Sequence, residues 1–243
     1  YNKDALTNSG YKKTVSIIPH AIDVNEIEKQ EFQELNLPLP VKNAYKFYSI
    51  FHWSKRKNPL ALLTAYFTEF ENENVILILR TYTGMKNDVD TISKEIGNLK
   101  TDLNLKSYPP VLLITSGLCY SEIISLHKMC DCYVSAHHSE GAGLPIMEAM
   151  ACKNPVIVPN YSGNMEYCTK ENAYFVETRL TPVCGQTDNI FWKKQYNAKM
   201  NWGDPDILSI RKNMRYVFEN KPVNHIGYQN IKEKYSYSSI GNL

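Results

Sequence analysis

The sequence has little net charge and no long run of apolar residues. Its 243 residues carry 27 Lys and Arg against 25 Asp and Glu, a formal net charge of +2 at pH 7. That balance is too small to indicate nucleic acid or an anionic membrane as the main partner. No apolar run approaches the ~20 residues of a membrane-spanning helix, and the start carries no signal peptide pattern. We therefore expect a cytoplasmic protein that holds any anion at a local site.

Paired cysteine motifs are also missing. The six cysteines are scattered, and none forms a CxxC pair or lies at a metal-like spacing from histidine. Cys130 and Cys132 flank Asp131 in an apolar stretch, where buried thiols behave as small hydrophobic residues. This pattern favours reduced thiols over a zinc site, and the sequence predicts no bound metal.

Glycine and proline, at 11 and 12 residues, are too few for a collagen-like or low-complexity chain. Short runs rich in Val, Ile and Tyr alternate with amphipathic helical segments, which is typical of a parallel sheet built from βαβ units. The predicted fold class is α/β, a doubly wound parallel sheet of Rossmann-like type in a single domain. The predicted strands are 15–18, 45–51, 75–80, 111–115, 131–135, 155–159 and 173–176.

Local signals also predict where helices begin and end. In the Asn-Pro pair at 58–59 and the Asp-Pro pair at 204–205, the first residue is expected to cap a helix and the proline to occupy its first turn. A short helix is expected over 3–8, ended by Gly10. The stretch 177–203 has no clear period and predicts an irregular excursion over the domain surface.

The main functional signal lies in 131–159, which is predicted to form a strand, a loop, a helix and a strand. Ligands of open parallel sheets bind beyond the carboxyl ends of the strands, where this loop runs into its helix. Gly141 and Gly143 let the backbone approach a ligand, and Pro145 lies where a helix N-terminus offers free amides. The loop is therefore predicted to attract a phosphate or a polar sugar.

Two carboxylates bracket this loop. Glu140 opens it and Glu148 lies early in the helix, with seven residues between them. The third glycine of a dinucleotide fingerprint is absent, which disfavours NAD. Carboxylates that flank backbone amides suit a ligand with hydroxyl groups at both ends and phosphate between them, as in a nucleotide sugar. The alternative is that both are ordinary surface carboxylates, the commonest place for Glu.

These residues resemble a known family. Glu140 and Glu148, within SEGAGLPIMEAMACKNPVIV, resemble the EX7E motif of the retaining glycosyltransferases of family 4, which have the two-domain GT-B fold. The resemblance covers nearly the whole chain and implies the C-terminal half of such an enzyme. Four further segments match in order: IIPHAID (17–23), RKNP (56–59), YSGNMEY (161–167) and WGDPD (202–206).

The resemblance implies roles for single residues. Glu140 would contact hydroxyls of the donor sugar near the reacting centre, and Glu148 would accept hydrogen bonds from the ribose. Lys57, with Arg56 beside it, would neutralise the diphosphate leaving group, where fixed positive charge helps most. The predicted catalytic residues are Glu140, Lys57 and Arg56, and the predicted donor contacts are Glu148, Gly141, Ala142, Gly143, Leu144 and His138.

Some features depart from the family or have ordinary alternatives. The family often has Arg five or six residues before the lysine, where this chain has Phe51 and His52. Donor turnover then depends on compensation by Arg56. A plain loop residue is the alternative for His138, and a solvated charge run is the alternative for 55–57.

The resemblance also implies the domain organisation and the partners. Residues 1–13 would be the last helix of a missing N-terminal acceptor domain with its linker, and 14–243 the donor-binding domain. The expected activity is retaining transfer from a nucleotide sugar to an unknown acceptor, in polysaccharide biosynthesis, without metal or cofactor. The chain alone would be inactive, no nucleic acid is expected, and any membrane acceptor would be held by the absent half. The alternatives are a nucleotide-sugar epimerase or phosphorylase of the same fold, or a non-catalytic nucleotide-sugar-binding module.

Overall fold

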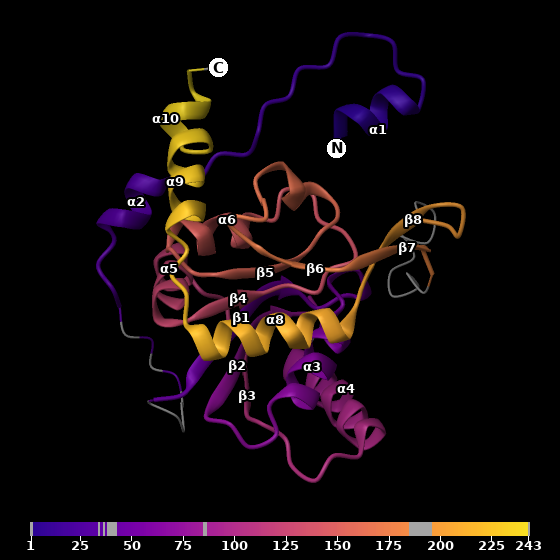
Figure 1. The fold of residues 1–243 in the computed structure, drawn as a ribbon, viewed down its shortest axis with the longest axis vertical. Coiled ribbons are helices and arrows are strands. Elements are labelled where there is room, and N and C mark those ends of the chain that lie inside the picture. Colours follow the sequence, from indigo (N-terminus) through magenta and orange to yellow (C-terminus); the bar gives the residue numbers. More distant parts are fainter. Residues whose placement is uncertain are drawn as a thin grey trace.

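The chain is built around one parallel sheet of six strands (Figure 1). The computed structural model describes residues 2–33, 35, 37, 43–84, 87–184 and 196–242. The strand order is β3-β2-β1-β4-β5-β6, so the predicted doubly wound sheet is confirmed. The strands are β1 (Tyr45–His52), β2 (Val75–Tyr82), β3 (Val111–Ile114), β4 (Cys132–Val134), β5 (Val156–Pro159) and β6 (Tyr174–Val176).

Helices cover both faces of the sheet. Successive residues of β1 point to opposite faces, so Phe47 packs in one apolar cluster and Tyr48 in the other. The Phe47 cluster is covered by α3 (Pro59–Glu69), α4 (Asp88–Leu103) and α8 (Ile207–Asn220). The Tyr48 cluster is covered by α2 (Val24–Lys29), α5 (Tyr120–Met129), α6 (Leu144–Ala151) and α9 (His225–Lys234). In Figure 1, α6 and α9 lie on the opposite side of the strands from α3 and α4.

The two ends of the chain carry short helices. The predicted helix at the start is present as α1 (Asn2–Asn8), and Gly10 follows it with a left-handed φ of 86°. At the other end, α10 (Tyr237–Ile240) follows α9. Within the described ranges, every helix is too short or too polar to cross a lipid bilayer.

The predicted strand over 15–18 is wrong. This segment has no strand partner, and the side chains of Ile17 and Ile18 are 52% and 75% exposed. An apolar run becomes a strand only when a neighbouring strand pairs with it, and the sheet ends at β3 and β6 instead. The prediction that Asn58 caps α3 with its side chain is also wrong. Asn58 ends the short 3-10 helix η1 (Lys55–Lys57) with a left-handed φ of 53° and makes no side-chain cap bond.

The second predicted cap is wrong by two residues. Asp204 and Pro205 end β8 (Asn201–Pro205), which pairs antiparallel with β7 (Thr178–Pro182). The irregular excursion predicted for 177–203 is thus in part a hairpin, and 185–195 lie outside the described residues. The true cap of α8 is Asp206, whose Oδ2 accepts the N–H of Ser209 at 2.7 Å.

We therefore expect Asp206→Ala to lower the free energy of unfolding by about 1 kcal/mol, since the cap bond is lost. Asp204→Ala is the matched control, because its partner Arg179 has an 82% exposed side chain and such pairs contribute only a few tenths of a kcal/mol. Urea unfolding of both variants measures the difference. An equal loss in both would contradict this assignment of the cap.

Candidate functional site

The two loops with the predicted site residues leave neighbouring strands. The chain winds from β1 outward to β3, then returns to β4 beside β1 and continues to β6. A crevice forms at such a reversal, beyond the carboxyl ends of the two central strands. β1 leads into η1 (Lys55–Lys57), and β4 leads into the loop before α6. We call the segment 135–143, between β4 and α6, the glycine loop. The strand order therefore brings this loop and the basic residues 55–57 to one place.

The predicted catalytic residues meet there. Lys57 Nζ forms a short ion pair with Glu140 Oε1, and Arg56 Nη1 lies 3.3 Å from Glu140 Oε2. The backbone joins the same loops, because His138 N–H donates to the Arg56 carbonyl at 2.8 Å. The side chains of Lys57 and Glu140 are only 13% and 10% exposed. A nearly buried carboxylate is thus shared by two cationic side chains.

Burial and charge act in opposite directions on this pair. Burial lowers the pKa of Lys57 below its ordinary value, although Glu140 opposes that shift. Burial alone raises the pKa of Glu140, but the positive charge and the hydrogen bond of Lys57, together with the positive charge of Arg56, outweigh it, so the pKa lies below its ordinary value. Glu140 is therefore an ionised acceptor at neutral pH.

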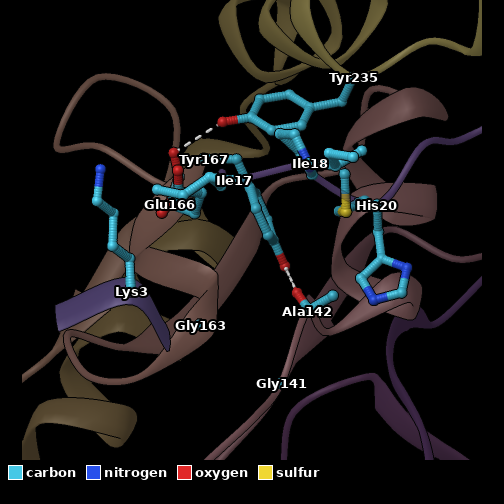
Figure 2. A pocket seen from close by; sticks show the side chains of 12 residues that line it. Lys3, Ile17, Ile18, His20, Gly141, Ala142, Gly163, Glu166, Tyr167 and Tyr235 are labelled. Atoms are coloured by element: carbon cyan, nitrogen blue, oxygen red, sulfur yellow. Dashed lines mark hydrogen bonds between the residues drawn. The ribbon is translucent and has the colours of Figure 1, made fainter. Parts of the chain in front are cut away.

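A second loop supports the glycine loop from beneath. Ser162 Oγ accepts the N–H of Glu140 at 2.9 Å, and Gly163 N–H donates to the Glu140 carbonyl at 3.1 Å. The Tyr167 hydroxyl donates to the Ala142 carbonyl at 2.7 Å, the contact drawn in Figure 2. Ser162 precedes the 3-10 helix η2 (Gly163–Glu166) but makes no side-chain cap bond to it. The family-like segment 161–167 was the sequence signal for this support.

The glycine loop ends where α6 begins. Gly143 has a left-handed φ of 74°, and Leu144 and Pro145 open the helix, so the predicted helix start is confirmed. A cavity of about 170 Å³ lies against Gly141 and Ala142. Figure 2 shows Ile17, Ile18 and His20 on its other side, from the segment before α2, together with Tyr235. The loop backbone thus borders a hollow, which suits close approach of a ligand.

His137 is a buried neutral side chain in the segment after β4. Its Nε2 bonds Asn164 Oδ1 at 3.1 Å and its Nδ1 bonds Ser135 Oγ at 2.8 Å. Asn164 Nδ2 donates to the Pro159 carbonyl, so its Oδ1 is the acceptor and the ring proton lies on Nε2. Burial lowers the pKa of His137 to about 4. The sequence gives no signal for this network, because its members come from two separate segments, one after β4 and one after β5.

Glu148, on α6, has other partners than the ion pair of Lys57 and Glu140. Its Oε2 is 3.4 Å from His127 Nε2. Burial raises the pKa of the Tyr133 hydroxyl, and the negative charges of both Glu140 and Glu148 raise it further. Tyr133 is on β4, the strand that leads into the glycine loop, so both carboxylates of the spaced motif act on one residue of that strand.

The side chains of His138 and His52 lie apart from the ion pair of Lys57 and Glu140. The His138 ring stacks on Trp202 with centroids 4.1 Å apart, and its Nδ1 bonds the Gly203 carbonyl at 2.7 Å. His138 thus lines a groove beside Asp204, a different hollow from the one at Gly141. His52 Nε2 bonds the Thr83 carbonyl at 3.1 Å, toward the β2 side of the crevice. Within the described ranges, no three His, Cys, Asp or Glu side chains come together as a metal site.

The neutral state of His137 predicts a pH dependence of stability. Between its unfolded pKa of about 6.5 and its folded pKa of about 4, the unfolded chain binds a proton that the folded chain does not. Stability therefore falls as the pH decreases, by about 2 kcal/mol from pH 7 to pH 5 for this group. His137→Gln is expected to lose less stability over that interval, as measured by urea unfolding at both pH values. Equal losses in the two proteins would show that His137 is not the titrating group.

The contact of Gly163 with the glycine loop predicts a large effect of one methyl group. A Cβ on Gly163 would lie 1.4 Å from the Gly141 carbonyl oxygen, whereas a Cβ on Gly141 meets nothing within 4 Å. We expect Gly163→Ala to destabilise the fold by at least the ~1 to 3 kcal/mol of an overpacked site. Gly141→Ala, the control, should change the melting temperature little. Similar melting temperatures for both variants would contradict the contact.

Comparisons with known proteins agree with this architecture. Residues 42–181 match the family model described as Glycosyl transferases group 1. No curated protein matches the sequence.

Several solved structures share the fold. The C-terminal domain of a glycosyl transferase group 1 family protein (LpcC) from Francisella tularensis is 20% identical, with a TM-score of 0.62 over 89% of this chain and 99% of that one. HepE from Anabaena, solved with UDP and glucose, is 18% identical, with a TM-score of 0.69 over 99% of this chain and 58% of that one. A glycosyltransferase from Rickettsia africae is 15% identical, with a TM-score of 0.69 over 98% of this chain and 58% of that one.

These likenesses concern the fold, and the chain spans less than two thirds of the length of the last two proteins. Its six-stranded parallel sheet is that of the Rossmann-like C-terminal domain of the GT-B fold. Because the family match covers more than half of the sequence, the chain belongs to the glycosyl transferases of group 1.

Proposed function

We propose that this chain is the donor-binding domain of a retaining glycosyltransferase that takes a sugar from a nucleoside diphosphate. The observation that carries the proposal is the nearly buried ion pair of Lys57 and Glu140 in the glycine loop, with the half-buried Arg56 beside it. Burying charged side chains is costly, because each partner loses its hydration. A buried group of charges is therefore expected to serve a function. A ligand that brings its own negative charge makes use of the two cations.

The leaving group of such a donor is a nucleoside diphosphate. As the bond from the sugar to the diphosphate breaks, negative charge builds up on the phosphate oxygens. Lys57 Nζ, the Arg56 guanidinium and the amides of 141–144 at the start of α6 are the groups that would stabilise it. Two fixed cations can supply this stabilisation without a metal ion, so we propose a metal-independent reaction without a cofactor.

In this account the carboxylates of Glu140 and Glu148 bind opposite ends of the donor. When a diphosphate draws Lys57 and Arg56, Glu140 is released from part of its ion pairing and can accept hydrogen bonds from sugar hydroxyls. Glu148, on the neighbouring turn of α6, accepts the ribose hydroxyls. HepE was solved with UDP and glucose, so a uridine diphosphate sugar is the first donor to test.

We also propose where the acceptor-binding part of the enzyme lies. The hollow beside Gly141 opens toward the segment 17–20, where Ile17 and Ile18 expose their side chains. We propose that this face adjoins an N-terminal acceptor domain, with residues 1–13 as its last helix and linker. In that arrangement the donor half alone transfers no sugar, and an acceptor at a membrane surface would be bound by the other domain.

A module that binds a nucleotide sugar without transferring it is the second candidate. Phe51 is buried in the sheet and His52 bonds Thr83, so neither supplies the arginine charge that the family often has before the lysine. This candidate binds the nucleotide sugar with the same residues, but it does not require Glu140 to act at a reacting centre. Transfer measured with the N-terminal half rejoined separates it from the first.

Titration calorimetry with UDP, GDP and ADP tests the donor site. We expect Lys57→Ala and Glu148→Ala each to weaken binding of the preferred nucleotide about 10- to 100-fold, because each removes a hydrogen bond to a charged group. Lys212→Ala, which removes one positive charge from an exposed position of α8, is the control and should bind as the wild type does. Binding that is indifferent to both site variants would refute the assignment.

A further inference from the structure

A chain of buried polar groups lies behind Glu148, outside the residues that contact the donor in our account. Tyr48 of β1 and His127 of α5 are each 0% exposed, and Asn154 follows α6 at 9% exposure. The Tyr48 hydroxyl and His127 Nδ1 are 2.6 Å apart. Residues from β1, α5 and the segment after α6 thus meet around His127.

The contacts determine which ring nitrogen carries the proton. Asn154 Nδ2 lies 2.6 Å from the His127 carbonyl oxygen, which can only accept, so this atom is the NH2 group. The same NH2 donates to the Tyr48 hydroxyl oxygen at 2.8 Å. Burial raises the pKa of Tyr48 well above its ordinary value, so the phenol keeps its own proton and donates it to His127 Nδ1. Because Nδ1 accepts this bond, the ring N–H is at Nε2.

That N–H faces Glu148. His127 Nε2 is fully buried and has no hydrogen-bond partner among the described residues. Glu148 Oε2 is 3.4 Å away, a few tenths of an ångström beyond an ordinary N–H···O distance. An unpaired buried N–H is destabilising, and a slight rotation of the carboxylate would satisfy it. The ring is thus a donor aimed at one oxygen of the motif carboxylate.

We propose that His127 is a positioning residue, which holds Glu148 Oε2 through its Nε2–H and leaves Oε1 directed at the ribose hydroxyls of the donor. The inference rests on the proposed function, in which Glu148 binds the ribose. The tautomer needed for this is set by Asn154 and Tyr48. His127 therefore contributes to the preference for a ribose with both hydroxyl groups, although it does not touch the nucleotide.

Two substitutions separate the two ring nitrogens. His127→Asn keeps an acceptor near the Nδ1 position for Tyr48 and removes the donor toward Glu148. His127→Gln keeps an N–H donor near the Nε2 position and loses the acceptor for Tyr48. Titration calorimetry compares UDP with 2′,3′-dideoxy-UDP, or the corresponding pair for the base that binds best.

We expect His127→Asn to weaken binding of the ribonucleotide about tenfold and to leave binding of the dideoxy nucleotide unchanged. His127→Gln should restore most of the discrimination. Tyr48→Phe, which keeps the buried ring and frees the tautomer, should give a smaller loss in the same direction, and it serves as the test if His127→Asn does not fold.

The outcomes separate this inference from the proposed function. Equal weakening of both nucleotides, or an unchanged ratio in both His127→Asn and Tyr48→Phe, would show a purely structural network and overturn the inference. Wild-type protein that binds no nucleoside diphosphate, or that discriminates ribose independently of Glu148, would overturn the proposed function and the inference with it. Loss of discrimination in Glu148→Ala with full discrimination in His127→Asn would overturn the inference alone.

Discussion

The ion pair between Lys57 and Glu140 is the interaction on which the site depends. It joins the loop after β1 to the loop after β4, at the point where the strand order reverses. Burying the two charges is costly unless they are well paired, so the pair requires the surrounding backbone to be held firmly. The position of Glu140 therefore depends on how firmly the backbone of the glycine loop is held.

Hydrogen bonds between buried uncharged groups hold this backbone in place. Ser162, Gly163 and Tyr167 hold the backbone of the glycine loop, while His137 ties its start to Asn164. A further set, centred on His127, lies behind Glu148. Each set joins segments that are distant in sequence, and each leaves the charged groups free to face the crevice. A rigid support of this kind is what preorganised electrostatic stabilisation requires.

The sheet and the central loop were predictable because their signals are local. Runs of β-branched and aromatic residues fix the strands, and the two glycines with Pro145 mark a loop that enters a helix. The helix start at Pro59 was predicted correctly, but Asn58 makes no side-chain cap bond, and the second cap was misplaced by two residues, because an Asx-Pro pair fits more than one structure. Asn58 tolerates the left-handed end of η1, and Asp204 is taken up by a strand whose partner lies more than 20 residues earlier. The supporting roles of His137, His127 and Tyr167 depend on tertiary contacts that no local pattern contains.

A crystal structure of this chain with UDP tests the central claim most directly. The account predicts phosphate oxygens within about 2.7 to 3.2 Å of Lys57 Nζ and of the glycine-loop amides, with the ribose against Glu148. It also predicts that the contact between Lys57 and Glu140 opens to admit the phosphate. A nucleotide bound in the groove beside His138 and Asp204, with the Lys57 and Glu140 pair intact, would contradict it.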